Sequence, residues 1–287
     1  MTEKDKSAVI KAKLQDIKDL PSLPLAADSI TRAVLDDKST AQTIATAISK
    51  DPSFASRILR VVNSAYYGFY RQITSIKEAV ALLGTNEIRM MAMAITVYDL
   101  FKAKEATRFN RKNLWMHGVA VAYMADYLQR TLRKGLDEAY VAGLLHDIGK
   151  IVLDQFFPEE THEILQLFES SEMSYLQAER EVLGLDHGEL GYLVAERWNL
   201  PAEITVGIRY HHATSGEIVV EPAAAIIHLS DYFAWQIGYV GSPDDPPESS
   251  HLSESLQGLG LDEERLESLM GTLREGFKKL EAFLAAN

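Results

Sequence analysis

The sequence predicts an all-α protein, and three observations support this prediction. Apolar residues recur at spacings of three and four along most of the 287 residues, which is the period of an amphipathic helix. Residues that cap or end helices stand at the borders of many of these runs. A strand pattern is found only in the short segment 217–221. We therefore expect an N-terminal helical bundle packed on a second helical half, with an amphipathic helix at the C-terminus.

Residues 1–106 are expected to form the N-terminal helical subdomain. Ser39 is a candidate N-cap, and Asp51 before Pro52 is typical of a helix start. Gly84 is a candidate helix end. The helices expected here span residues 9–20, 26–35, 40–49, 53–64, 76–83 and 86–101.

An aromatic cluster follows the helix expected at 53–64 and consists of Tyr66, Tyr67, Phe69 and Tyr70. These side chains could form a recognition surface, or they could form a hydrophobic turn packed between helices. Because aromatic side chains bury large areas in protein cores, we favour the packed turn.

Residues 107–240 are expected to form the second helical subdomain. The polar and charged segment 102–112 is the predicted seam between the two. The helices expected in this half span residues 113–132, 137–148, 158–170, 174–183, 188–198, 201–212 and 221–237.

Residues 241–287 are expected to form a loop and a final helix. The segment 241–253 has the proline- and serine-rich composition of a loop. The final helix either packs in the core or contacts a partner. Its apolar stripe comprises Leu266, Leu269, Leu273, Phe277, Leu280 and Leu284.

Composition limits the classes of function. The formal net charge is −12, and no run of basic residues interleaved with aromatics is present, so a nucleic-acid partner is not favoured. Cysteine is absent, which excludes disulfides and thiolate metal ligands. No apolar run has membrane-spanning length, and the first residues are polar rather than signal-like. We expect a cytoplasmic protein without a membrane partner.

The apolar run 139–150 contains His146 and Asp147 side by side. A buried carboxylate is costly unless it is paired or binds a metal, and neutral imidazole is a common metal ligand. Gly149 is expected to end this helix, and Lys150 to stand at its mouth. Taken alone, the dipeptide favours a core histidine hydrogen-bonded to its neighbouring aspartate.

Four further histidines alter that interpretation, because each lies near an expected helix end. His117 opens one helical run, His187 opens another, and His211 with His212 closes a third. Side chains from several helices can converge at such ends. Asp231 lies in an apolar helix and is a second buried carboxylate that needs a partner.

Two glutamates, Glu179 and Glu181, precede the turn that contains His187. They could hold a histidine in place by a hydrogen bond to its ring. They could instead lie on a solvated helix face, and we favour this second interpretation.

The order of His117, His146-Asp147, His187, His211-His212 and Asp231 is similar to that of the HD superfamily of metal-dependent phosphohydrolases. From Leu20 to Trp235 the chain more closely resembles the HDOD domain. The matching stretches are Leu20-Pro-Ser-Leu-Pro24, Asp51-Pro52, Val62-Asn-Ser-Ala-Tyr-Tyr-Gly68, Ser75-Ile-Lys-Glu-Ala-Val-Ala-Leu-Leu-Gly84, Trp115-Met-His117, Gly143-Leu-Leu-His-Asp-Ile-Gly149, Trp198-Asn-Leu-Pro201 and Ile208-Arg-Tyr-His-His212.

The resemblance to the HD superfamily implies a site with two divalent transition-metal ions bridged by Asp147. It implies that Asp147 and Lys150 are the catalytic residues, with Lys150 holding a substrate phosphate. Iron, manganese, nickel and zinc all suit such ligands, and the sequence does not choose among them. One ion would be bound by His117, His146 and Asp231, and the other by His187, His211 and His212.

The related HD-GYP group cleaves cyclic dinucleotides and has a Gly-Tyr-Pro signature shortly after its paired histidines. Here His211-His212 is followed by Ala-Thr-Ser-Gly-Glu-Ile-Val-Val-Glu-Pro, which departs from that signature. Cleavage of cyclic dinucleotides is therefore not favoured, while hydrolysis of another phosphate ester stays open.

Two functions are consistent with the resemblance. The first is an HDOD-type signalling or regulatory module of bacterial signal transduction that contains an HD-type metal site. The second is a metal-dependent phosphohydrolase or phosphodiesterase acting on a nucleotide or another phosphate ester. We favour the module because the HDOD-specific motifs lie outside the metal constellation. Its expected partners are signalling proteins or a small phosphorylated ligand, and a homo-oligomer is compatible with the final helix.

Overall fold

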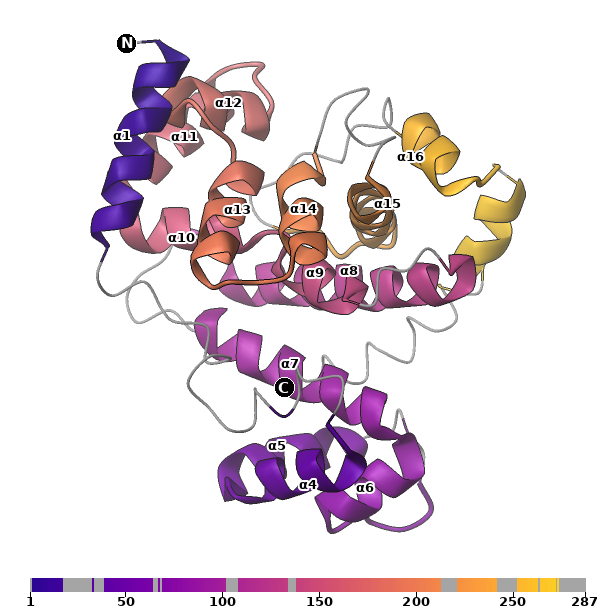
Figure 1. Ribbon diagram of the computed structural model, residues 1–287. Helices are drawn as coiled ribbons and strands as arrows, with labels where there is room; N and C mark the ends of the chain where they lie inside the picture. Colours follow the sequence, from indigo (N-terminus) through magenta and orange to yellow (C-terminus); the bar gives the residue numbers. More distant parts are fainter. Residues whose placement is uncertain are drawn as a thin grey trace. The chain divides into compact units, whose positions relative to one another are not determined.

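In the computed structural model, the described part of the chain is built of α-helices joined by turns and short extended segments (Figure 1). Within the described ranges every regular element is a helix, so the all-α prediction is confirmed. The candidate strand at 217–221 lies outside these ranges except for its last residue. The described residues are 2–17, 33, 39–63, 67, 69–101, 108–133, 138–212, 221–241, 252–262, 264–271 and 273.

The chain forms two compact units. Unit 1 consists of Met1–Leu20 and Phe101–Ser268, and unit 2 consists of Pro21–Leu100 and Leu269–Asn287. The chain therefore begins in unit 1, builds most of unit 2, and then returns to complete unit 1. These units are defined by contacts in space, and the three linear subdomains expected from the sequence stay a prediction.

Unit 2 contains α4 (Ala41–Ser49), α5 (Pro52–Val62), α6 (Ile76–Leu83) and most of α7 (Thr85–Phe101). Local capping fixes where these helices begin. The Asp51 carboxylate accepts a hydrogen bond from the Phe54 amide at 3.0 Å, as its place before Pro52 predicts. Helix α4 is capped by Thr40 and not by Ser39. The expected helix at 26–35 lies outside the described residues apart from position 33.

The aromatic segment of unit 2 is only partly packed. Tyr70 is fully exposed, so the packed-turn interpretation is wrong for this residue. Tyr67 stacks on Phe69 with ring centroids 6.2 Å apart, and its hydroxyl donates to Glu87 at 2.7 Å. Tyr66 lies outside the described residues.

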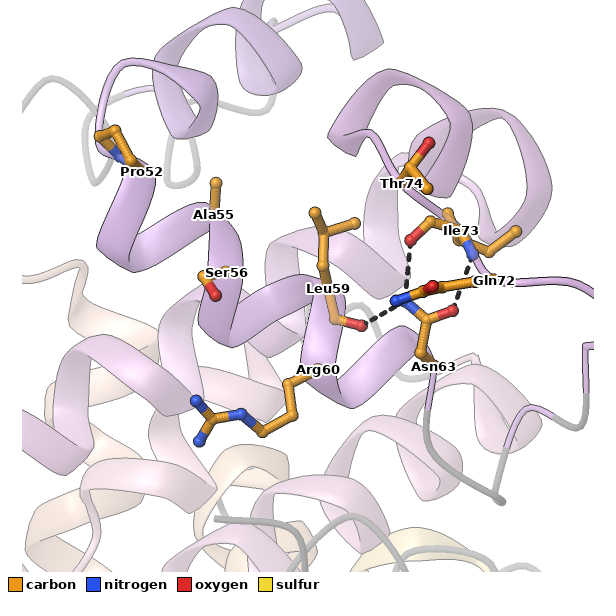
Figure 2. A pocket seen from close by; sticks show the side chains of 9 residues that line it. All are labelled: Pro52, Ala55, Ser56, Leu59, Arg60, Asn63, Gln72, Ile73 and Thr74. Atoms are coloured by element: carbon orange, nitrogen blue, oxygen red, sulfur yellow. Dashed lines mark hydrogen bonds between the residues drawn. The ribbon is translucent and has the colours of Figure 1, made fainter.

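A groove of about 620 Å³ lies between α5 and the extended segment 72–74 in unit 2 (Figure 2). Asn63 fixes one wall, because its amide donates to the carbonyls of Leu59 and Ile73, both at 2.8 Å. The Asn63 side-chain oxygen also accepts from the Ile73 amide at 2.7 Å. None of the histidines and aspartates singled out in the sequence lines this groove. Its lining residues are Pro52, Ala55, Ser56, Leu59, Arg60, Asn63, Gln72, Ile73 and Thr74.

Unit 1 is built around the long helix α8, which packs against α9 and α15. Helix α14 lies against α9, α13 and α15, and α10 packs on α13 (Figure 1). Most of α15 is buried because its sequence is apolar on all sides. The helices described in unit 1 are α1 (Glu3–Asp16), α8 (Arg111–Leu132), α9 (Ala139–Leu145), α10 (Ile148–Phe156), α11 (Pro158–Ser170), α12 (Tyr175–Leu183), α13 (His187–Arg197), α14 (Ala202–Tyr210), α15 (Pro222–Gln236) and α16 (Leu252–Leu259).

The prediction that Gly149 ends a helix is wrong. Helix α9 ends at Leu145, a turn contains His146 and Asp147, and α10 begins at Ile148 with Gly149 inside it. A Cβ atom at Gly149 would lie 2.0 Å from the carbonyl oxygen of His187. The glycine is thus required by the close approach of α10 and α13, which brings Asp147 near the start of α13.

The helix expected at the C-terminus is described only in part. Residues 264–271 are helical, and Leu266 and Leu269 are buried, whereas Phe277, Leu280 and Leu284 lie outside the described residues. In the parts of the chain that the structure describes, no helix has the length and apolar composition needed to cross a bilayer.

Candidate metal centre

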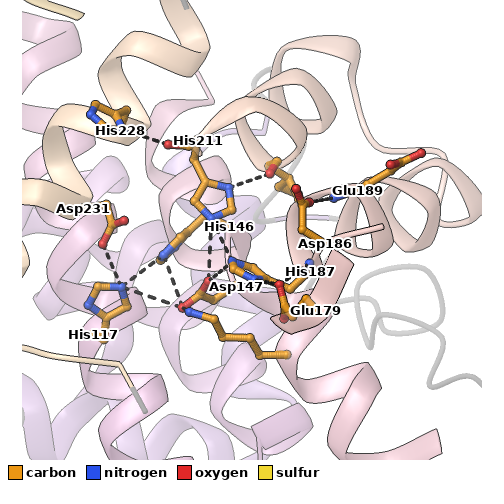
Figure 3. A network of polar contacts seen from close by, with 12 residues as sticks. His117, His146, Asp147, Glu179, Asp186, His187, Glu189, His211, His228 and Asp231 are labelled. Atoms are coloured by element: carbon orange, nitrogen blue, oxygen red, sulfur yellow. Dashed lines mark hydrogen bonds and ion pairs between the residues drawn. The ribbon is translucent and has the colours of Figure 1, made fainter. Parts of the chain in front are cut away.

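The structure brings all seven predicted metal ligands into one buried region of unit 1, and Figure 3 labels all of them except His212. They come from five places in the chain, namely α8, the α9–α10 turn, the start of α13, the turn after α14, and α15. Six of the seven are at most 3% exposed, and only His212 reaches the surface in part. The seven are His117, His146, Asp147, His187, His211, His212 and Asp231.

These residues form two groups in which the potential ligand atoms lie within 4.8 Å of one another. We call His117, His146 and Asp231 the Asp231 cluster. We call the remaining group the His187 cluster, and it consists of Asp147, His187, His211 and His212.

Both imidazoles of the Asp231 cluster have their tautomer set by a backbone carbonyl. His117 Nδ1 lies 2.8 Å from the carbonyl oxygen of Tyr239. His146 Nδ1 lies 2.7 Å from that of Gly143. A carbonyl oxygen only accepts hydrogen bonds, so each Nδ1 is the N–H donor and each neutral ring keeps a lone pair on Nε2. The two Nε2 atoms are 3.1 Å apart, and two lone pairs at that distance repel unless a cation lies beside them.

The His187 cluster repeats this arrangement with one difference. His211 Nδ1 donates to the carbonyl oxygen of Ile208 at 2.6 Å. His187 Nδ1 donates instead to the carboxylate of Glu179 at 2.7 Å. The Nε2 atoms of His187 and His211 are then 3.3 Å apart. Four imidazoles thus turn Nε2 towards the interior of the site and Nδ1 away from it, as metal-binding histidines do.

Asp147 lies between the two clusters and presents one oxygen to each. Its Oδ1 atom is 3.2 Å from His187 Nε2 and 3.7 Å from His211 Nε2. Its Oδ2 atom is 3.5 Å from His146 Nε2 and 3.8 Å from His117 Nε2. A carboxylate placed in this way can bind two ions at once.

Several of these atoms lack hydrogen-bond partners among the described residues. They are Asp147 Oδ1, Asp231 Oδ1 and His212 Nε2, and all three are buried. Buried polar atoms in proteins nearly always have a hydrogen-bond partner. Oxygen and imidazole nitrogen are ligands for divalent transition metals, so the atoms left unpaired fit a metal site.

The environment separates the proton affinities of the histidines. Burial lowers the pKa of His146 to about 3, and burial also holds the pKa of His212 well below its usual value. Burial acts in the same direction on His187, but the carboxylates of Glu179 and Asp147 outweigh it and raise the pKa of His187 to about 10. A metal ion bound to His187 Nε2 therefore has to displace a proton.

Glu179 is the residue whose part in the site was not expected. It has no exposed surface, and its Oε2 atom accepts from both the ring and the backbone amide of His187, at 2.7 and 2.9 Å. The solvated-face interpretation is wrong for Glu179 and holds for Glu181, which is exposed and pairs with Lys6. A signal was present in the sequence, since Glu179 stands four residues after the buried Tyr175, on the apolar face of α12.

Lys150 does not stand at the mouth of a helix. It occupies the first turn of α10, has no exposed surface, and places Nζ 3.0 Å from Asp147 Oδ2. Its Nζ also lies 6.0 Å from the ring centroid of Tyr175. Burial raises the pKa of Asp147, but Lys150 and the imidazoles of His146, His187 and His211 outweigh it and hold this pKa well below its usual value, so the carboxylate is ionised.

Comparison with known proteins identifies the family and the fold. The sequence profile of the HDOD domain matches residues 20–214. The chain is 24% identical to an HDOD domain protein of unknown function from Geobacter sulfurreducens. The TM-score is 0.79, and the match covers 99% of this chain and 98% of that one. A Shewanella amazonensis protein named a candidate phosphohydrolase is 23% identical with a TM-score of 0.75, over 96% of this chain and 97% of that one. At these identities the structures establish the fold alone.

A relative of known sequence extends well beyond this chain. An uncharacterized protein of Treponema pallidum is 28% identical over 207 residues, which are 68% of this chain and 38% of that protein. The chain thus spans well under half the length of this relative.

Proposed function

Because the chain belongs to the HDOD domain family, we propose that it is a regulatory module of bacterial signal transduction that binds divalent metal ions. The observation that supports metal binding is the convergence of four imidazole Nε2 atoms on a carboxylate with one oxygen towards each pair. Its partners would be signalling proteins or a small phosphorylated ligand. The net charge of −12 does not favour nucleic acid.

The residues that would hold two ions follow from the two clusters. His117, His146 and Asp231 would bind one ion. His187, His211 and His212 would bind the other, and Asp147 would bridge the two. Bound ions would supply Lewis acidity towards a phosphate oxygen and would activate water at neutral pH. Imidazole and carboxylate ligands suit iron, manganese, nickel and zinc alike.

Burial is the reason to place the module ahead of an enzyme. Asp147 is 3% exposed and Lys150 is 0% exposed, and the two are paired with each other. A phosphate ester has to reach the catalytic groups, whereas a regulatory ion has only to be held. A closed metal site fits a module whose ions stabilise the arrangement of α8, α9, α13, α14 and α15.

A metal-dependent phosphohydrolase is the second candidate, and the position of Asp147 between the clusters favours it. Two ions clamped by one carboxylate can stabilise both the attacking and the leaving oxygen of a phosphoryl transfer. Lys150 would then release Asp147 and bind the substrate phosphate through Nζ. This role requires Lys150 to change its rotamer, because it now points to Asp147.

Turnover assays distinguish the two functions. The metal-loaded protein would be tested for phosphate or nucleotide release on a panel of nucleoside phosphates, cyclic nucleotides and phosphodiesters. The double variant Asp147→Ala/Lys150→Met is the control, since it removes the shared carboxylate and its buried counterion together. The module predicts no release above that control. Release by the wild type that disappears in the control would overturn the module in favour of the hydrolase.

A further inference from the structure

Helix α15 faces the site with two residues that are three positions apart, His228 and Asp231. Residues at this spacing lie on the same face of a helix. Asp231 Oδ1 is 3.1 Å from His117 Nε2 and belongs to the Asp231 cluster. His228 is 1% exposed, and its Nδ1 atom lies 2.9 Å from the backbone carbonyl oxygen of His211 (Figure 3). One helix therefore contacts both clusters, although His228 is in neither.

The carbonyl that His228 contacts lies at the C-terminal end of α14. His211 is the C-cap of α14, and the last carbonyls of a helix have no partner within the helix. A buried carbonyl of this kind needs a donor from elsewhere. The oxygen only accepts, so His228 Nδ1 supplies the N–H.

This carbonyl also belongs to the peptide group that joins His211 to His212. The peptide group is planar, so a hydrogen bond to its oxygen fixes the orientation of the plane. The side chains of both residues start from that plane, and their rings lie with centroids 4.0 Å apart. Holding the peptide therefore limits the directions in which both imidazoles can point.

We propose that His228 is a positioning residue for the His187 cluster. Its Nδ1–H holds the peptide between His211 and His212 so that both rings present Nε2 to the interior of the cluster. The inference rests on the proposed metal site and adds a residue to it. Helix α15 then sets both clusters, one through the Asp231 carboxylate and the other through the His228 ring.

The competing explanation is that His228 only fills space in the core. Two substitutions separate the explanations, because the two explanations predict opposite orders of metal affinity for the two variants. His228→Asn places an amide N–H where Nδ1 stands but leaves unfilled volume. His228→Leu fills the volume but cannot donate. Positioning predicts that Asn preserves metal binding better than Leu, and packing predicts that Leu preserves it better.

The test is a titration of the chelator-treated full chain with Co²⁺, followed by visible absorption and by elemental analysis after dialysis. We expect the wild type to bind two ions. In His228→Leu, one of the two is expected to bind about 10- to 100-fold more weakly, as for other residues that orient metal ligands. His228→Asn is expected to bind both ions nearly as the wild type does. Asp231→Asn removes a charge from the Asp231 cluster and should weaken binding of the ion in that cluster. The absorption spectrum of the Co²⁺ that stays bound should therefore differ between Asp231→Asn and His228→Leu.

The outcomes separate this inference from the proposed function. If the wild type binds no Co²⁺, the metal site and the inference both fail. If the wild type binds two ions and His228→Leu binds both equally well, only the inference fails. If His228→Leu does not fold, His228→Gln decides, because its amide lies one bond too far along to replace Nδ1 and should behave as Leu would.

Nuclear magnetic resonance tests the hydrogen bond in the wild type, without any substitution. In the wild type, the ¹⁵N signals of His228 should show a proton on Nδ1 that exchanges slowly with water. A ring protonated only on Nε2 would overturn the proposal, because such a ring cannot donate to the His211 carbonyl.

Discussion

The two clusters contain the same types of side chain, histidine and aspartate, but differ in the groups that accept a hydrogen bond from the imidazole Nδ1 atoms. In the Asp231 cluster, both Nδ1 atoms donate to neutral backbone carbonyls, and the pKa of His146 falls to about 3 because burial dominates. In the His187 cluster, His187 donates to the Glu179 carboxylate, and with Asp147 this raises its pKa to about 10 in spite of burial. A carboxylate that accepts from Nδ1 therefore strengthens the hold of the ring on its proton, whereas a neutral carbonyl does not offset burial.

This difference has a consequence for metal binding. Burial keeps the pKa of His146 at about 3, so its Nε2 atom is unprotonated at neutral pH and can accept an ion directly. The His187 cluster has to lose a proton first, but its ring is the more basic ligand once that proton has left. The two sites should therefore respond differently to pH.

The largest effect is expected for Asp147→Ala, because Asp147 serves both clusters. The variant should lose both ions, and it leaves the Lys150 ammonium buried without its ion-pair partner. Removing one member of a buried pair costs about 3–5 kcal/mol of unfolding free energy. Urea denaturation of chelator-treated protein would measure this loss.

The matched control for that prediction is Asp147→Ala/Lys150→Met, which removes both charges. It should recover most of the unfolding free energy and still bind no metal. If the double variant were no more stable than the single one, the buried pair would not be the source of the loss.

The next effect concerns Glu179→Gln, which removes the charge that raises the pKa of His187. In the wild type, the affinity of the His187 cluster should rise by up to about tenfold per pH unit between pH 6 and 9, since binding releases one proton. In the variant this dependence should flatten. At pH 9 the affinity should fall about 10- to 100-fold, because the ring is a weaker ligand. Chelator competition across this pH range would measure both.

Glu181→Gln is the control for Glu179→Gln, because Glu181 is exposed two positions away. It should leave the affinity and its pH dependence unchanged. An equal effect of the two substitutions would mean that the overall charge of α12, and not the contact with His187, controls the site.

Acid should destabilise the metal-free protein through His146. Its pKa is about 3 when folded and about 6.5 when unfolded. Between these two pH values His146 is protonated in the unfolded chain and unprotonated in the folded chain. The free energy of unfolding therefore falls as the pH drops below 6.5. From pH 7 to pH 5 this residue alone accounts for about 2 kcal/mol. Denaturation at both pH values should show a smaller decline in His146→Gln, and an unchanged decline would contradict the lowered pKa.

The smallest effects concern the helix packing beneath the clusters. Gly149→Ala places a methyl group against the His187 carbonyl and should cost about 1–3 kcal/mol by forcing α10 from α13. Gly271→Ala is the control, since that helical glycine has open space around its Cβ position. It should stabilise the protein by up to about 1 kcal/mol. Equal melting temperatures for the two variants would contradict the close approach.

Helical periodicity was sufficient to predict the fold class, because the spacing of apolar residues within one short segment indicates which face of its helix is buried. The cap at Asp51 and the helix end at Gly84 were likewise local signals. Gly149 was misread, because a glycine needed for a contact with α13 looks the same in sequence as a glycine that ends a helix. The contact lies 38 residues away along the chain, so no local pattern reports it.

The sequence was sufficient to predict which residues meet in the candidate site, but not what surrounds them. The two aspartates could be singled out because a buried carboxylate needs a partner, and the histidines because they lie near expected helix ends. The resemblance to the HD superfamily implied that they belong to one set. The backbone carbonyl of Tyr239 that fixes His117 has no side-chain signature at all. Glu179 did have one, because it stands on the apolar face of α12, but its charge favours the solvated interpretation. The burial of Lys150 depends on α10, which begins at Ile148. The sequence did not predict this helix, because Gly149 was interpreted as a helix end.

We propose that residues distant in the sequence form one binding site for divalent metal ions. Elemental analysis of the purified full chain beside Asp147→Ala/Lys150→Met is the sharpest test. We expect two divalent transition-metal ions per wild-type chain and none in the variant. A wild type that binds no such ion after incubation with iron, manganese, nickel and zinc, or a variant that binds as many ions as the wild type, would contradict it.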